Sequence, residues 1–93
     1  MKRVMNNQQE KNIDVILADV KNELTRAIDL FETFHSAHEG YGVLLEEVDE
    51  LWDIVKINGD NEAMIEEAIQ VAAMAVRFVL DVCMRRVNDN EHT

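Results

Sequence analysis

The residues best suited to chemistry are acids in the stretch GYGVLLEEVDELWDIV. On a helix with 3.6 residues per turn, Glu47 and Glu50 fall on one line with Val43 and Ile54. A solvated face would not normally place apolar residues on both sides of its acids, so this line is expected to face another part of the protein. Glu46 stands at the edge of the same patch.

A second polar pair lies near the start of the next helical segment. Glu67 and Gln70 are three residues apart, and Met74 continues their line along the helix. Both pairs lie at a similar distance from the turn sequence NGDN, which separates the two segments. If the segments form an antiparallel hairpin, Glu47 and Glu50 can meet Glu67 and Gln70.

Carboxylates brought this close together must be neutralised. Two unit charges about 4 Å apart repel by about 4 kcal/mol at an effective dielectric constant near 20, so the group binds either protons or a cation. Carboxylate oxygens are hard ligands that suit Mg²⁺ or Mn²⁺, and Mg²⁺ in turn commonly binds substrate phosphates. Since acidic helix faces are usually just solvated, a metal site and a solvated face both stay open on spacing alone.

Three long helices are expected to position these groups. The chain has no Pro and only three Gly, which argues against sheets and many-turned folds. Apolar residues recur at helical spacing over residues 8–34, 37–57 and 62–87. The expected fold class is therefore all-α, an antiparallel bundle of three long helices. On the first helix, Glu23 and Arg26 are assigned to a solvated face opposite the apolar one.

The helix ends carry signals of their own. Ser36 and Glu39 are spaced as a capping box, in which each side chain accepts a free backbone N–H at the start of the second helix. Gly59 is expected to adopt the left-handed conformation that ends this helix. Asp60 or Asn61 can then cap the third helix.

The third helix is too apolar for a lone chain of this size. Residues 68–84 are apolar on nearly every face, so the helix has to be surrounded, and two other helices cannot do that alone. We therefore expect a homo-oligomer with this helix at its centre. The second helix is expected to contribute a main core stripe, in which packing of Trp52 is favoured over stacking on a base. The stripe consists of Tyr41, Leu44, Leu45, Val48, Leu51, Trp52 and Val55.

Length and charge narrow the classes of function. The 93 residues suffice for one domain spanning 1–93, with 1–7 and 88–93 expected to fray. The net charge of −10 disfavours direct binding of nucleic acid and of anionic membranes, both of which need basic surface. The single Cys83 cannot form an internal disulfide, and the N-terminal residues MKRVMNNQQEKN have no signal-peptide core, so we expect a cytoplasmic protein.

Two motifs resemble those of a known family. The segment LLEEVDEL is similar to the E-E-x-x-E-L signature of the MazG-like nucleotide pyrophosphohydrolases. The segment EEAIQVAAMAVRF is similar to the second element of that family, which is usually E-x-x-D followed by an apolar run. The resemblance covers residues 31–83, within a small single-domain branch, and the first helix fits it loosely. The two motifs together, on adjacent helices, are more specific than either one.

The resemblance implies an all-α fold that assembles as dimers or tetramers, with the active site between helices. It implies hydrolysis of a nucleoside triphosphate to the monophosphate and pyrophosphate. Carried over to this sequence, Glu47, Glu50 and Glu67 would ligate Mg²⁺, and Glu46 would be a further ligand or would orient the attacking water. Gln70 stands where the family has Asp, and it can offer a metal its carbonyl oxygen but no charge.

Four further residues are candidates for substrate binding, each with a structural alternative. His38 lies one turn before the acids, in a segment where a turn residue is the default. Lys56 and Arg77 are cations available to a triphosphate, although ion pairing explains them equally well. Asp81 can lie at one end of the substrate, or it can pair with Arg77 or Arg85.

A second class of function is kept open by the same features. The net charge and Gln70 also suit a catalytically silent acidic helical bundle that binds a basic partner or mimics nucleic acid. The two classes differ in their response to divalent ions. A site metal stabilises the folded state specifically, whereas an acidic surface responds to ionic strength of any kind.

Overall fold

The computed structural model describes residues 4–85, and over this range the chain is helical without strands. The helices are α1 (Asn7–Leu30), α2 (Ala37–Lys56) and α3 (Asn61–Phe78). A π-helical turn, η1 (Val79–Cys83), continues α3 without a break. The predicted all-α class is confirmed. The last two residues of the predicted third helix (86–87), the first three residues expected to fray (1–3) and the whole segment 88–93 lie outside the described residues.

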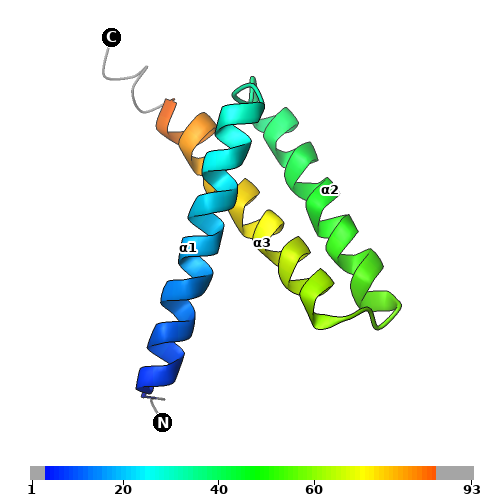
Figure 1. The fold of residues 1–93 in the computed structure, drawn as a ribbon. Coiled ribbons are helices and arrows are strands. Elements are labelled where there is room, and N and C mark those ends of the chain that lie inside the picture. The colour runs from blue at the N-terminus through cyan, green and yellow to red at the C-terminus, as the bar shows by residue number, and fades with distance from the viewer. Residues whose placement is uncertain (1–3, 86–93) are drawn as a thin grey trace.

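The helices form a hairpin crossed by a third helix (Figure 1). α2 and α3 are joined by a short turn and pack side by side, so they run antiparallel. α1 packs on α3, and its N-terminal half extends away from the hairpin. α3 therefore contacts a helix on two sides. Within residues 4–85, no helix is long and apolar enough to cross a bilayer.

Helix α1 begins at a capping box that the sequence analysis missed. The Asn6 side chain accepts a hydrogen bond from the backbone N–H of Gln9 at 2.8 Å, and the Gln9 side chain accepts one from the backbone N–H of Asn6 at 3.0 Å. Two of the free N–H groups at the helix start are thereby paired. Asn7, which was expected to fray, is the first residue of the helix.

Helix α1 ends at Leu30, four residues before the predicted end at residue 34. The reason is tertiary. The Arg77 side chain donates to the backbone carbonyls of residues 31 and 32, while Asp81 accepts the backbone N–H of Phe34 at 3.2 Å. Phe34 itself is only 2% exposed. The segment after α1 is thus anchored on α3 and η1 instead of continuing the helix.

The turn between α2 and α3 differs from the expectation for Gly59. The residue in the left-handed region is Asn58, with φ of 53°, a conformation that Asn tolerates better than most residues. Gly59 is needed for a different reason, because a Cβ there would lie 2.6 Å from the side chain of Ile54. Of the two cap candidates, Asp60 caps α3 by accepting the backbone N–H of Ala63 at 2.8 Å.

The start of α2 follows the sequence prediction in part. The Ser36 hydroxyl accepts the backbone N–H of Glu39 at 3.0 Å, which is one half of the predicted capping box. Gly40, in the first turn, is buried, and a Cβ there would lie 2.8 Å from Phe78 and 3.0 Å from Phe34. The missing side chain therefore allows α2 to approach α3 closely at this end of the hairpin.

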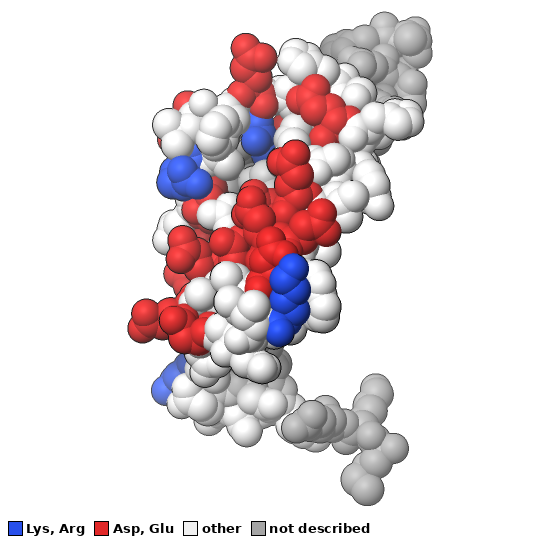
Figure 2. All heavy atoms as spheres, turned by 90° about the vertical axis from the view of Figure 1, so that its right-hand side faces the viewer, with Lys and Arg blue, Asp and Glu red and all other residues white. Residues whose placement is uncertain are grey.

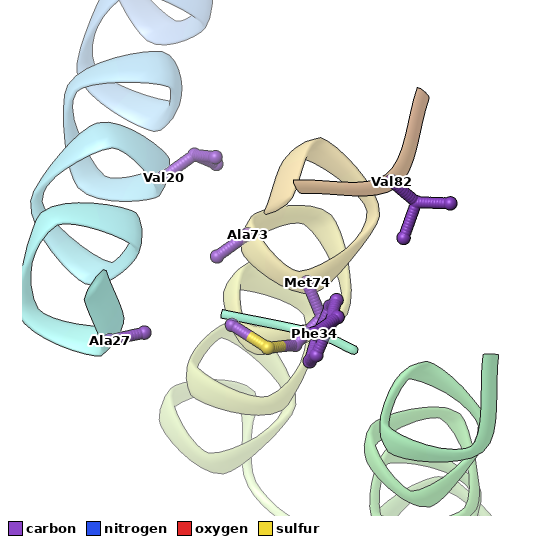
Figure 3. Close-up of a cluster of buried hydrophobic side chains, with 6 residues drawn as sticks. All are labelled: Val20, Ala27, Phe34, Ala73, Met74 and Val82. Atoms are coloured by element: carbon purple, nitrogen blue, oxygen red, sulfur yellow. The ribbon is translucent and has the colours of Figure 1, made fainter. Parts of the chain in front are cut away.

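The core is small, and one part of it lies at the crossing of α1 and α3 (Figure 3). Val20 and Ala27 point from α1 toward α3, and Ala73 points back toward them. Small residues at this crossing let the two helices approach closely. The buried apolar residues are Val20, Ala27, Phe34, Ala73, Met74 and Val82.

The predicted core stripe of α2 is only partly buried in the single chain. Leu44 and Leu51 are half-buried, whereas Tyr41 is 61% exposed, Trp52 is 58% exposed, and Leu45, Val48 and Val55 are exposed as well. Val43, Glu47 and Ile54, from the stripe that carries the acids, are half-buried. The hairpin brings this second stripe inward and turns the more apolar stripe outward.

Candidate metal centre

Three carboxylates from the two hairpin helices converge. Glu47 and Glu50 lie on successive turns of α2, and Glu67 lies in the second turn of α3. Each offers one carboxylate oxygen, and these three oxygens lie within 4.8 Å of one another. The meeting of the two helices at these residues, expected for an antiparallel hairpin from their similar distance to the turn, is confirmed.

Two oxygens of this group lack hydrogen-bond donors. The Oε2 atoms of Glu47 and Glu67 are buried, and within residues 4–85 neither has a hydrogen-bond partner. A buried carboxylate oxygen without a donor is unfavourable by about 1–3 kcal/mol or more, and such atoms are rare in folded proteins. The arrangement therefore suits a bound proton or cation better than an empty cluster of charges.

The pKa values of Glu47 and Glu67 reflect their burial and the repulsion between the carboxylates. Burial raises the pKa of Glu47 to about 7, and the nearby charges of Glu50 and Glu67 add to the effect. The pKa of Glu67 is also raised, first by burial and then by the charge of Glu50. At neutral pH Glu47 is thus poised between its protonated and ionised forms.

The cluster lines a cavity of about 610 Å³ between α1, α2, α3 and the segment that follows α1. This volume is in the range of small-molecule sites. Besides the cluster, the lining includes Gln70 and three other acids, Glu23, Glu32 and Glu39. The apolar part of the lining consists of Ala27, Phe31, Phe34, Val43 and Met74. The cavity therefore has both a carboxylate-rich part and an apolar part.

Helix α1 contributes a carboxylate that sequence reasoning assigned to solvent. The Glu23 side chain is only 16% exposed and lines the cavity. Its hydrogen bonds with Arg26 lower its pKa and an interaction with Gln70 lowers it further, while its own charge helps to raise the pKa of Glu47. A signal was available, because Glu23 lies three residues after Val20 and four before Ala27, on the buried side of the helix.

The other predicted site residues on α2 lie outside the cavity lining. Glu46, expected as a further ligand or a water-orienting group, is exposed. His38 is exposed as well. Lys56 is exposed and pairs with Asp53 at 2.9 Å. The geometry of the chain therefore gives Glu46, His38 and Lys56 no role in the site.

Arg77 and Asp81 form the structural ion pair that the sequence analysis held open. Arg77 Nε lies 3.1 Å from Asp81 Oδ2, and Arg77 is only 3% exposed. The guanidinium also lies 4.5 Å from the centre of the Phe34 ring. Although Arg77 lines the cavity, its donors hold the segment after α1, so we assign it to the fold and not to substrate.

We expect the metal-free protein to lose stability as pH rises from about 4.5 to about 7. The pKa of Glu47 is higher in the folded than in the unfolded protein. Its contribution to the free energy of unfolding is therefore complete at a pH below the unfolded-state pKa, and it is lost as the pH rises through the folded-state pKa. Because solvent partly screens a half-buried group, the loss attributable to Glu47 is about 1–2 kcal/mol. Urea unfolding across this range, compared with Glu47→Gln, measures it. An equal slope in the two proteins would contradict the assignment.

Comparison with known proteins does not assign the chain to a family. No family model, curated protein or solved structure matches the chain. The case for a function therefore rests on the chemistry of the cluster and its cavity, together with the two sequence motifs.

Proposed function

We propose that the chain binds Mg²⁺ or Mn²⁺ through Glu47, Glu50 and Glu67 and hydrolyses a nucleoside triphosphate to the monophosphate and pyrophosphate. The observation that carries the proposal is the convergence of three carboxylate oxygens within 4.8 Å. Two of these residues also have a buried oxygen for which residues 4–85 provide no hydrogen-bond donor. Hard oxygen donors of this kind suit these cations. The motifs around the cluster resemble those of the MazG-like pyrophosphohydrolases, which supports the reaction.

The bound cation would draw charge from the reacting phosphorus and lower the pKa of an attacking water. The residues of the chain supply the rest. Glu47, Glu50 and Glu67 would hold the cation, and its charge would relieve the repulsion among the three carboxylates. The apolar lining at Phe31, Phe34 and Met74 offers a surface for a nucleobase and excludes water from that side.

The replacement of the family's Asp by Gln70 is compatible with this proposal. Gln70 lines the cavity and can offer a cation its carbonyl oxygen, and Glu23 of α1 lines the same cavity. Because Glu23 is paired with Arg26, the negative charge toward a cation comes from Glu47, Glu50 and Glu67.

The direct test is to incubate the protein with Mg²⁺ and a panel of ribo- and deoxyribonucleoside triphosphates and to measure pyrophosphate. We expect release that stops on chelation by EDTA and returns when Mg²⁺ is restored in excess. Absence of pyrophosphate with every nucleotide, for folded protein and with Mn²⁺ also tried, would end the enzymatic claim.

The alternative is an acidic interaction protein, and a charged surface motivates it. Figure 2 shows Asp and Glu side chains gathered in a patch at the middle of the face on the α2 side. Thermal melting distinguishes the two proposals. A site metal at a hundredfold excess over its Kd stabilises the fold by roughly 2.7 kcal/mol, whereas an acidic surface responds equally to Na⁺ at the same ionic strength.

We also propose that the chain assembles with copies of itself through the exposed stripe of α2. Tyr41, Leu45, Val48, Trp52 and Val55 are spaced alternately by four and three residues, the pattern with which two helices pack along a seam. A self-complementary seam of this kind suits a second copy of the same helix. Dimer and tetramer are both compatible with it.

The surface of the chain supports such an assembly. Its accessible area is 7361 Å², whereas a compact monomer of 10.7 kDa exposes about 5,500 Å². Its radius of gyration is 15.9 Å against about 12 Å for a compact domain of this length. The excess area of about 1,900 Å² on one chain is larger than the roughly 800 Å² that each partner buries in a standard interface.

Trp52 reports on this assembly because it is the only tryptophan. On concentrating the protein we expect its emission to shift to shorter wavelength as the ring leaves water, together with a rise in mass by sedimentation. Val48→Glu should keep the chain monomeric by placing a charge in the seam. Val15→Glu, the same change at an exposed position of α1, is the matched control. Equal masses for the two variants would exclude the α2 stripe as the interface.

A further inference from the structure

Arg26 lines the cavity from α1 and is held there by Glu23. The guanidinium makes two hydrogen bonds to this carboxylate, from Nε at 3.1 Å and from Nη2 at 2.5 Å. The Glu23 side chain is largely buried, whereas that of Arg26 is 53% exposed. The pair therefore fixes one edge of the guanidinium and leaves its other edge accessible.

The cavity has a charge imbalance that a polyphosphate would meet on entry. Six glutamates line it, against two arginines. A divalent cation on the three-carboxylate cluster offsets only part of this charge, so the phosphates of a bound nucleotide still face carboxylates. An anionic ligand in such a cavity needs a cation of the protein as well.

Of the two arginines, Arg26 is the more accessible to a ligand. Arg77 is only 3% exposed, its Nε bonds Asp81, and its Nη2 bonds two backbone carbonyls. Arg26 has five N–H donors, of which Glu23 receives two in the part of the chain that the structure describes. The remaining donors are forked, which is the arrangement that matches the oxygens of a phosphate.

We infer that Arg26 contacts the polyphosphate of the substrate, with its ion pair to Glu23 holding the guanidinium in the cavity. The inference rests on the proposed function, which supplies the phosphate ligand. It assigns α1 a part in the site, although both sequence motifs lie on the other two helices. The alternative is that Arg26 and Glu23 form only a structural ion pair between neighbouring turns of α1, which would not contact a ligand.

The test uses tripolyphosphate with saturating Mg²⁺ as the probe, titrated into the full chain by calorimetry. We expect Arg26→Gln to weaken tripolyphosphate binding by about ten- to a hundredfold, because charge-assisted hydrogen bonds are lost. Arg26→Lys keeps the charge but lacks the forked donors, so its affinity for tripolyphosphate should lie between those of Arg26→Gln and the unchanged protein. It replaces Arg26→Gln in the test if that variant folds poorly. Lys21→Gln removes the same charge from an exposed position of α1 outside the cavity lining, and should change binding less than about twofold.

The outcomes separate this inference from the proposed function. Equal tripolyphosphate affinity in Arg26→Gln and the unchanged protein, or failure of the unchanged protein to bind the probe, overturns the role of Arg26. If Lys21→Gln weakens tripolyphosphate binding as much as Arg26→Gln does, the role of Arg26 is also overturned, because the probe is then attracted by the overall charge and not by a contact with Arg26. If Arg26 proves necessary for the probe but no nucleotide releases pyrophosphate, the hydrolytic function fails while the phosphate contact stands.

Discussion

Glu50→Gln is expected to abolish pyrophosphate release while making the metal-free protein more stable. The residue supplies one of the three converging oxygens, and its charge is among the causes that raise the pKa values of Glu47 and Glu67. Removing a ligand should lower the rate at least about a hundredfold, since loss of outer partners alone costs 10–100-fold. Relief of repulsion should raise the free energy of unfolding by up to about 1 kcal/mol.

The measurement combines pyrophosphate release, Mg²⁺ titration and urea unfolding on the same variant. Asp49→Asn is the matched control, because it removes one exposed acid from the same helix outside the cavity. The control should retain its rate and its stabilisation by Mg²⁺. A Glu50→Gln protein that still gains stability from Mg²⁺ as the unchanged protein does would remove the cluster as the metal site.

Arg77→Met should destabilise the fold by about 3–5 kcal/mol, the cost of leaving one member of a buried ion pair without its partner. Asp81 is left nearly buried without its cation, the carbonyls of residues 31 and 32 lose their donor, and Phe34 loses the guanidinium over its ring. A domain of this size has little stability to spare, so much of the protein is expected to unfold.

Chemical denaturation with far-UV circular dichroism measures this effect. Arg26→Met makes the same change in an ion pair whose arginine is 53% exposed, and it should cost much less than Arg77→Met. Adding Asp81→Leu to Arg77→Met should recover part of the loss, because it removes the unpaired carboxylate. A cost for Arg77→Met no larger than that for Arg26→Met would show that the segment after α1 is not anchored in this way.

Much of the frame follows from local sequence. Helical periodicity, the absence of Pro and the caps at Ser36 and Asp60 specify where α2 and α3 begin, since these signals act within a few residues. The meeting of Glu47 and Glu50 with Glu67 also follows, because a short turn forces the hairpin into a single register.

Other features were decided by packing between distant segments. The sequence predicts which residues share a helical face, but two faces of α2 are apolar enough to pack, and close approach at Gly40 helps to bring the acidic one inward. Helical periodicity also fails to show which face of α1 packs. By sequence, Glu23 and Arg26 are assigned to a solvated face, but the packing of α1 across α3 places both in the cavity lining.

The sequence by itself determined the all-helical class, the caps at Ser36 and Asp60 and the convergence of the hairpin carboxylates, because each depends on contacts within a turn or across one short connection. The tertiary structure alone decided that α1 adds Glu23 and Arg26 to the cavity, that Arg77 serves the fold, and that the apolar stripe of α2 stays exposed. These outcomes depend on which helix faces meet, and helical periodicity carries no information on the choice between two faces of similar character.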